Sequence, residues 1–224
     1  SLYLHVPFCA RMCWYCGCHT KVVNRYDPIR DYAKALAKEV DLVADTVADG
    51  LTVSHLHWGG GSPTALENTD FLMIMTRLRE RFGFTDGAEL AVEIDPRTMT
   101  EDKAETLAAC GINRISFGIQ DFNAKVQAAI NRIQTFEETR DVLDTLRRHG
   151  INAVNLDLMY GLPHQTAADA DRTVDMAVEL APDRFSVFGY AHVPWMKTHQ
   201  KMIDEQALPG AEARWEQADA VAER

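Results

Sequence analysis

Four of the five cysteines in this 224-residue chain lie within ten residues of one another near its start. They are Cys9, Cys13, Cys16 and Cys18, and the first three have the spacing C-x3-C-x2-C. Cysteine thiolate is the usual protein ligand of iron–sulfur clusters. Three thiolates on one short loop can bind three irons of a 4Fe–4S cluster and leave the fourth iron open for a ligand that is not protein. The spacing therefore favours a reductive, substrate-binding cluster ligated by Cys9, Cys13 and Cys16, and not by Cys18.

Two other uses of these cysteines remain open from their spacing alone. Structural zinc takes four ligands, and Cys13 with Cys16 resembles one zinc knuckle that Cys9 and either Cys18 or His19 would complete. A disulfide framework would need an oxidising compartment, and no secretory signal precedes the motif in these residues. Clustered thiols kept for a metal instead indicate a reducing cytoplasm.

The composition narrows the classes of protein to which the chain can belong. Apolar residues make up 46% of it, which is enough for a substantial core. The net charge of −10 argues against a non-specific binder of nucleic acid or anionic membranes, which would carry a basic stripe. No apolar run approaches the roughly 20 residues that a membrane span needs. We expect a soluble, cytoplasmic monomer, with Cys110 as a small buried hydrophobe in its core.

Short apolar runs alternate with longer amphipathic stretches along the chain, which predicts a parallel sheet with crossover helices. The expected strands are 2–6, 51–58, 88–94, 112–119, 151–160 and 183–191. The expected helices are 28–48, 69–82, 100–110, 136–149 and 167–180. Six such units are too few to close an eight-stranded barrel. We therefore expect an α/β fold with a six-stranded parallel sheet, either open and doubly wound or a partial (β/α)6 barrel.

Local signals set the expected ends of several helices. Asp27 is the expected N-cap of the first helix, because a proline follows it at a position that suits the first helical turn. Gly83, Gly111 and Gly150 each follow a helix, where a left-handed C-cap is expected.

Polar clusters follow the predicted strands, and ligands of parallel α/β folds bind at the carboxyl ends of strands. The cysteine loop follows the first strand. Residues 59–63, GGGSP, follow the second, where glycines let the backbone approach a ligand closely, although a tight turn is the alternative. Glu93, near the end of the third, is costly to bury unless it binds a ligand or pairs with Arg97 or Arg114.

The remaining strand ends carry Gln120 and Asp157, and Arg132 lies in the connection between them. Arg132 can grip a carboxylate through two parallel hydrogen bonds, whereas a buried Arg132–Asp157 ion pair is the purely structural alternative. Four histidines lie in or beside strands, and we expect each to be a hydrogen-bonded core or rim residue instead of a metal ligand. These histidines are His5, His55, His57 and His192.

Taken in order, seven segments resemble the oxygen-independent coproporphyrinogen III oxidase family of the radical S-adenosylmethionine (SAM) superfamily. They are YLHVPFCARMCWYCGC, HWGGGSP, EIDPR, GIQDFN, NRIQ, NLDLMYGLPHQT and YAHVP, which together cover essentially the whole chain. The C-x3-C-x2-C signature is shared by the whole superfamily, but the extra cysteine of C-x2-C-G-C is much narrower. Related haem chaperones usually have an aromatic residue where Cys18 stands.

The resemblance implies a fold and a set of cofactor sites. The fold is a partial (β/α)6 barrel, with residues 1–224 as the radical SAM core of a protein whose N-terminal segment and C-terminal domain are outside this sequence. The open iron of the cluster would hold the amino and carboxylate groups of a first SAM. Positions that contact this SAM in the family correspond to Tyr3, Tyr15, Gly60 and Glu93. Positions that contact a second SAM correspond to Gly61, Ser62, Gln120, Arg132, Asp157 and Ala191.

The resemblance also implies an activity. A reduced cluster would cleave SAM to methionine and a 5′-deoxyadenosyl radical, which would take hydrogen from a propionate of coproporphyrinogen III. Loss of carbon dioxide and one electron would leave a vinyl group, and two such conversions would give protoporphyrinogen IX. The electron donor and acceptor are unidentified partners, and Arg11, Lys21 and Arg25 are candidates for the substrate's carboxylates. A radical SAM methyltransferase that also uses two SAM molecules, or a non-catalytic haem chaperone, is the alternative.

Overall fold

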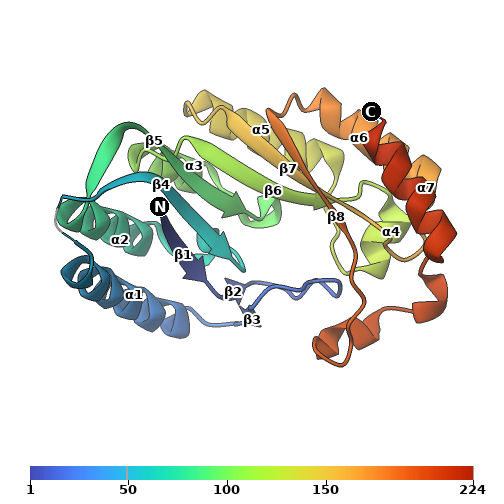
Figure 1. Cartoon of the computed structure of the whole chain (residues 1–224), viewed down its shortest axis with the longest axis horizontal. Coiled ribbons are helices and arrows are strands. Elements are labelled where there is room, and N and C mark those ends of the chain that lie inside the picture. The colour runs from blue at the N-terminus through green and yellow to red at the C-terminus, as the bar shows by residue number, and fades with distance from the viewer. Residues whose placement is uncertain (49, 224) are drawn as a thin grey trace. The chain divides into compact units, whose positions relative to one another are not determined.

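The computed structural model describes residues 1–48 and 50–223 (Figure 1). Within them, six strands form one sheet in the order β1-β4-β5-β6-β7-β8, and the pairs β1–β4, β4–β5 and β7–β8 are parallel. The strands are β1 (Leu2–Val6), β4 (Thr52–Gly60), β5 (Gly83–Ile94), β6 (Arg114–Gln120), β7 (Ala153–Tyr160) and β8 (Arg184–Gly189). A separate parallel ladder joins β2 (Phe8–Cys9) to β3 (Lys21–Val22). The order of the main sheet follows the chain, which confirms the six strand–helix units predicted from the sequence.

The chain divides into two compact units. Within the described ranges, the first unit comprises residues 1–10, 19–115 and 145–152. The second unit comprises residues 11–18, 116–144 and 153–224. None of the helices in the described part of the chain is both long enough and apolar enough to cross a membrane.

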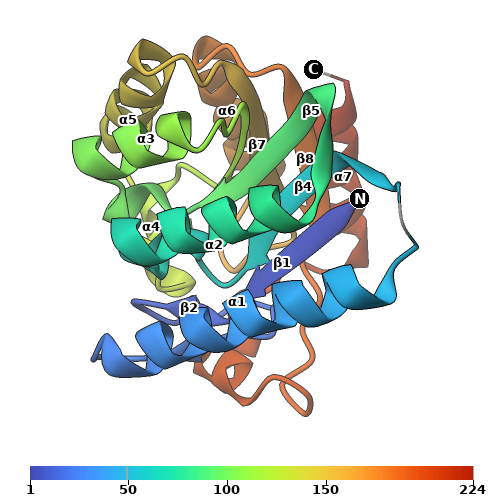
Figure 2. The same ribbon diagram turned by 90° about the vertical axis from the view of Figure 1, so that its left-hand side faces the viewer.

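In the first unit, helices α1 (Asp27–Thr46), α2 (Asn68–Arg81) and α3 (Glu101–Ala109) lie on one face of β1, β4 and β5 (Figures 1 and 2). Helix α1 turns apolar side chains at three- and four-residue spacing into the core, where they are removed from water. Trp58 of β4 and Phe71 of α2 fill the space between sheet and helix, with ring centroids 4.6 Å apart. Cys110 is buried as predicted, and burial raises the pKa of its thiol.

The second unit contains helices α4 (Ala124–Ala129), α6 (Ala167–Glu179) and α7 (Ala211–Ala222) and most of α5 (Phe136–Arg148). Helix α7 packs against α6. A cluster of buried apolar side chains forms at one end of β7 and β8, and Trp14 and Tyr15 of the cysteine loop pack against it. The buried members of this cluster are Val126, Ile130, Leu162, Tyr190 and Ile203. The two aromatic side chains between Cys13 and Cys16 thus anchor the loop to this apolar cluster.

Two of the predicted helix ends are wrong. Gly83 does not cap α2, because the chain is already extended at Phe82 and Gly83 is the first residue of β5. Asp27 is the first residue of α1, and the N-cap is Tyr26, which makes no side-chain cap. Gly111 and Gly150 do adopt the left-handed conformation, with φ of 77° and 85°. The short helix α4 had no periodic signal from which to predict it.

Asp121, directly after β6, is a fully buried carboxylate that accepts hydrogen bonds from three neutral groups. The donors are the backbone N of Asn123 at 2.5 Å, Gln165 Nε2 at 2.7 Å and Thr173 Oγ1 at 3.2 Å. Burial raises the pKa of Asp121 from 3.8 to about 6, although the hydrogen bonds oppose the rise. Between pH 3.8 and about pH 6, the folded chain therefore binds the proton of the Asp121 carboxyl more tightly than the unfolded chain does. The stability of the fold therefore falls as the pH rises through about 6.

We expect the free energy of unfolding to fall between about pH 5 and pH 7 more steeply in the parent chain than in an Asp121→Asn variant, because the amide has no charge to desolvate. The decrease in the free energy of unfolding over this interval should be about 1 kcal/mol larger in the parent chain than in the variant. Urea unfolding of both iron-free proteins at the two pH values measures the difference. Equal slopes would show that Asp121 titrates as an ordinary aspartate.

Candidate cofactor site

Glu93, near the carboxyl end of β5, is held by the end of β4. Its Oε2 accepts a hydrogen bond from the backbone N of Gly60 at 3.0 Å, and its Oε1 lies 3.2 Å from His57 Nε2. The ring of Tyr3 stacks on that of His57, with centroids 5.8 Å apart and planes at 11°. Three residues predicted for the first SAM site, Tyr3, Gly60 and Glu93, are therefore connected within the first unit. His57 connects two of them, and the sequence interpretation gave it no role in the site.

The salt bridges considered for Glu93 are not formed. Arg97 pairs with Asp95 at 2.6 Å, and Arg114 pairs with Glu89 at 2.8 Å. Glu93 thus keeps a carboxylate whose partners are a backbone N–H and an imidazole, with more than a third of the side chain exposed to solvent. Such a carboxylate is available to accept hydrogen bonds from a ligand's ammonium or hydroxyl groups.

The glycine-rich segment after β4 lies directly against the chain that leads into the cysteine loop. The backbone N of Ser62 donates to the carbonyl O of Phe8 at 2.8 Å, and that of Gly61 donates to the carbonyl O of Val6 at the same distance. Gly60 has a φ of 115°, and a Cβ there would lie 2.7 Å from the ring of His5. The strand runs through Gly60, and the chain then bends at Gly61 and enters a 3-10 helix, η1 (Pro63–Ala65). The glycines serve close backbone packing at the predicted site.

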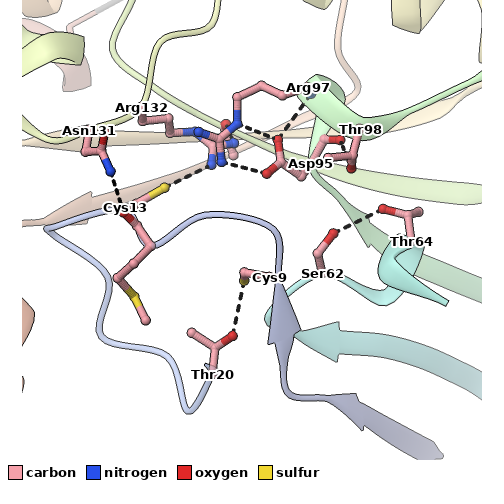
Figure 3. Close-up of polar contacts among 12 residues, drawn as sticks. Cys9, Cys13, Thr20, Ser62, Thr64, Asp95, Arg97, Thr98, Asn131 and Arg132 are labelled. Carbon is pink, nitrogen blue, oxygen red and sulfur yellow. Dashed lines mark hydrogen bonds and ion pairs between the residues drawn. The ribbon is translucent and has the colours of Figure 1, made fainter. Parts of the chain in front are cut away.

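Each of the three predicted cluster ligands has a hydrogen-bonding partner at its sulfur. In the first unit, Cys9 Sγ lies 3.1 Å from Thr20 Oγ1 (Figure 3). The β2–β3 ladder produces this contact, because it pairs Phe8 and Cys9 with Lys21 and Val22 and so brings Thr20 beside the cysteine. A hydroxyl in this position can donate to a metal-bound sulfur, and such bonds tune the potential of iron–sulfur clusters.

In the second unit, Arg132 Nη1 donates to Cys13 Sγ at 3.6 Å (Figure 3), and the backbone N of Cys18 donates to Cys16 Sγ at 3.3 Å. Arg132 also donates to the carbonyl O of Gly118. A hydrogen bond with the Cys18 side chain and burial raise the pKa of the Cys16 thiol above its ordinary value. This sulfur must therefore lose a proton when it binds metal.

The cysteine loop is also fixed through its backbone. Asn131 Nδ2 donates to the carbonyl O of Met12 at 2.8 Å, and the backbone N of Trp14 donates to the carbonyl O of Ile130 at 2.9 Å. Asn131 has a φ of 55°, a conformation that asparagine tolerates better than most residues. The segment that carries Arg132 thus holds the loop at Cys13 from both sides.

Gln120 ends β6 in a strained and buried position. Its φ is 69°, only 7% of the residue is exposed, and its Oε1 has no hydrogen-bond partner among the described residues. A buried amide oxygen without a partner costs free energy, so such groups in native proteins ordinarily meet a ligand or an ordered water. Backbone strain of this kind also concentrates at functional sites. Gln120 therefore has the features expected of a residue that completes its hydrogen bonding with a cofactor.

Asp157 lies inside β7 and not at the end of this strand, and Ala191 follows the carboxyl end of β8. Asp157 accepts hydrogen bonds from Asn155 Nδ2 at 2.7 Å and from Ser116 Oγ at 3.2 and 3.3 Å. Ala191 follows β8, and its carbonyl O accepts a hydrogen bond from Gln200 Nε2 at 3.2 Å. Ser116 lies on β6 and Gln200 on a later segment, so these two contacts could not be read from the local sequence, whereas Asn155 is two residues from Asp157 on the same strand.

The donor set fits an iron–sulfur cluster. None of the five cysteines, all of which lie in the described ranges, forms a disulfide, so the disulfide alternative is wrong. No three His, Cys, Asp or Glu side chains of residues 1–48 and 50–223 converge closely enough to hold one metal ion. In a 4Fe–4S cluster each protein thiolate binds a different iron, so its ligands need not converge on one ion. The histidines predicted to be hydrogen-bonded are so, including His5 to Tyr3 and His192 to Tyr190.

Comparison with known proteins identifies the family of the chain. The model of the radical SAM superfamily matches residues 3–177. The oxygen-independent coproporphyrinogen III oxidase of Bradyrhizobium diazoefficiens is 54% identical over 99% of this chain and 49% of its own length. The protein of the same name from Paracoccus denitrificans is 44% identical over 96% of this chain and 48% of its own. The chain spans about half the length of the curated relatives it matches.

Among solved structures, the coproporphyrinogen III oxidase of Escherichia coli, described as a radical SAM enzyme, has a TM-score of 0.93 and 41% sequence identity. The match covers 98% of this chain and 50% of that one. Both the fold predicted from the sequence and the predicted cofactor classes, a 4Fe–4S cluster and SAM, are thereby confirmed. The chain belongs to the radical SAM superfamily.

Proposed function

We propose that residues 1–224 form the core domain of an oxygen-independent coproporphyrinogen III oxidase, which converts two propionates of its substrate to vinyl groups and yields protoporphyrinogen IX. The observation that carries this proposal is the 54% identity to a protein of that name along 99% of the chain. The reaction needs an electron donor and a final electron acceptor, and a reducing cytoplasm suits both the reaction and the clustered thiols.

Cys9, Cys13 and Cys16 are the proposed ligands of the 4Fe–4S cluster. When bound and reduced, the cluster supplies the electron that cleaves SAM. The chain's own contribution is to supply hydrogen bonds to the three sulfurs, from Thr20, Arg132 and the backbone N of Cys18. Cys18 is proposed to lie outside the ligand set because it stands only two residues beyond Cys16 in the three-plus-one spacing of the motif.

The proposed first SAM is bound by Tyr3, Tyr15, Gly60 and Glu93, and the second by Gly61, Ser62, Gln120, Arg132, Asp157 and Ala191. Glu93 is held in place by the backbone N of Gly60 and by His57, which supports a role in binding a polar ligand group. The partnerless, buried Oε1 of Gln120 supports the second site. Among the candidates for the substrate's carboxylates, Arg25 already pairs with Asp27 at 2.9 Å, which leaves Arg11 and Lys21 as the stronger ones.

We expect Asp157→Asn to weaken one of two SAM-binding events and to spare the other. A charged hydrogen bond is worth roughly 1.5–3 kcal/mol, or about 10–150-fold in affinity. Calorimetric titration of the reconstituted product of the complete gene measures both events, and iron content should remain that of the parent. Arg132→Ala should weaken the same event.

Asp183→Asn is the matched control, because Asp183 accepts a hydrogen bond from the backbone N of Val154 near the amino end of β7. It should leave both binding events unchanged. One SAM per parent protein, or equal losses in the Asp157 and Asp183 variants, would contradict the assignment of Asp157 to a second SAM.

The identity of the product tests the proposed function. Anaerobic incubation of the product of the complete gene with SAM, reductant and coproporphyrinogen III should release carbon dioxide and convert propionates to vinyls. S-adenosylhomocysteine with a methylated substrate would identify a methyltransferase instead. Tight haem binding with coproporphyrinogen III unchanged would identify a haem chaperone.

A further inference from the structure

The segment that follows β8 in the second unit holds the backbone of the cysteine loop. It includes a short 3-10 helix, η3 (Thr198–Met202), and three of its side chains donate hydrogen bonds to carbonyl oxygens of the loop. These contacts run from Lys197 Nζ to Cys18 O at 3.0 Å, from His199 Nε2 to Cys16 O at 2.7 Å and from Gln200 Nε2 to Tyr15 O at 3.0 Å.

Gln200 differs from Lys197 and His199 because it is buried and because both the NH2 group and the oxygen of its amide form hydrogen bonds. Only 1% of the residue is exposed. Its Nε2 donates to Tyr15 O and also to Ala191 O, at 3.0 and 3.2 Å. Its Oε1 accepts a hydrogen bond from the backbone N of Val193 at 2.6 Å. One side chain therefore joins the cysteine loop to the turn that follows β8.

The two carbonyls that share this amide belong to different cofactor sites. Tyr15 is proposed to contact the first SAM and Ala191 the second, so the inference rests on the proposed function. We propose that Gln200 is a positioning residue that couples the two SAM sites by holding the backbones of Tyr15 and Ala191 at a fixed separation. Gln200 itself touches neither cofactor in this account.

The chemistry of the amide explains why glutamine is needed. An NH2 group has two hydrogens and can donate to two carbonyls at once, while the carbonyl of the same amide accepts from Val193. Leucine fills a similar volume but leaves these three backbone groups without the amide. Glutamate keeps an acceptor for Val193 but turns an oxygen toward two carbonyl oxygens, which repels both. Buried backbone groups that lose a partner are costly, so the loop and the turn are expected to move apart.

Gln217 provides a matched control within the same unit. It is also 1% exposed, and its amide likewise joins two backbone groups, the N of Gly161 at 2.8 Å and the carbonyl O of Gln165 at 2.6 Å. Gln217→Leu therefore removes two buried hydrogen bonds, against three in Gln200→Leu, without touching Tyr15 or Ala191. A loss of stability alone should affect both leucine variants alike.

The test is calorimetric titration of SAM into the anaerobically reconstituted product of the complete gene. Gln200→Leu is expected to weaken both binding events by at least about 10-fold, which corresponds to about 1.4 kcal/mol, while iron content is kept. Gln200→Glu should show the same double loss, and Gln217→Leu should bind both SAM molecules as the parent does.

Three results would overturn the coupling. Parent-like binding of both SAM molecules by Gln200→Leu would do so, and so would loss of only one event. If neither Gln200 variant folds while Gln217→Leu does, Gln200 is a folding residue and the proposal is wrong. A parent protein that binds only one SAM would refute the second site itself, a failure of the proposed function that is visible before any variant is made.

Discussion

Serine at Cys9, Cys13 or Cys16 is expected to abolish binding of the 4Fe–4S cluster, whereas serine at Cys18 should leave the cluster bound. A serine hydroxyl is a much poorer ligand for iron than a thiolate, so each ligand substitution removes one of three attachments. The Cys18 side chain is not required in the same way, because it is the backbone N of Cys18 that donates to Cys16 Sγ, and serine keeps this N–H. Iron content and visible absorbance after anaerobic reconstitution measure the outcome.

Cys110→Ser is the control for this series, since Cys110 is buried in the first unit and belongs to no predicted site. It should keep its iron. Loss of the cluster in Cys18→Ser alone would refute the argument that three cysteines leave one iron open. Stoichiometric zinc in protein purified without oxygen would return the motif to the zinc alternative.

The strands were predictable because their apolar residues are contiguous and bounded by turn residues. Their ends were less so, and β5 shows why. It begins at Gly83 and not at residue 88, since Gly83 and Phe84 pair with Thr52 and Val53 of β4 across a register shift. The three residues that follow Phe84 are TDG, and the glycine has a φ of 73°, so their local propensity opposes a strand. Pairing with a neighbouring strand decided the structure there.

Topology made the place of candidate residues such as Glu93 and Gln120 predictable, because the carboxyl ends of parallel strands share one edge of a sheet. Tyr3, Tyr15 and Ala191 were predicted to contact SAM from the family resemblance alone.

The side chains that contact these candidates could not be predicted in either way. Gln200 and Tyr15 are separated by 185 positions in sequence, and Arg132 and Cys13 by 119. No periodicity or spacing rule reports a hydrogen bond over such separations. Arg132 also donates a hydrogen bond to the sulfur of Cys13, a proposed cluster ligand. This contact is additional to the carboxylate binding that the sequence analysis expected of Arg132.

Gly61→Ala is expected to disrupt cluster binding from outside the cysteine motif. A Cβ at this position would lie 2.4 Å from Thr20 Oγ1, 2.7 Å from the carbonyl O of Phe8 and 3.0 Å from Cys9 Sγ. Thr20 can rotate away, but the carbonyl of Phe8 can move only with the backbone, and it already accepts a hydrogen bond from the N of Ser62 at 2.8 Å. We expect overpacking to lower the free energy of unfolding by about 1–3 kcal/mol. Iron bound after reconstitution should fall well below that of the parent, because Cys9 and its Thr20 partner are displaced together.

Gly17→Ala separates this steric effect from a general sensitivity to added methyl groups. Gly17 lies between Cys16 and Cys18, and a Cβ there would meet nothing within 4 Å. Neither glycine has a left-handed φ, so alanine strains the backbone at neither position, and only the space around the new carbon differs. In urea unfolding of the iron-free proteins, Gly17→Ala should match the parent while Gly61→Ala is destabilised. A destabilised Gly17→Ala, or a Gly61→Ala protein with parental stability and iron content, would show that close packing of this loop against Phe8 and Cys9 is not what the glycine provides.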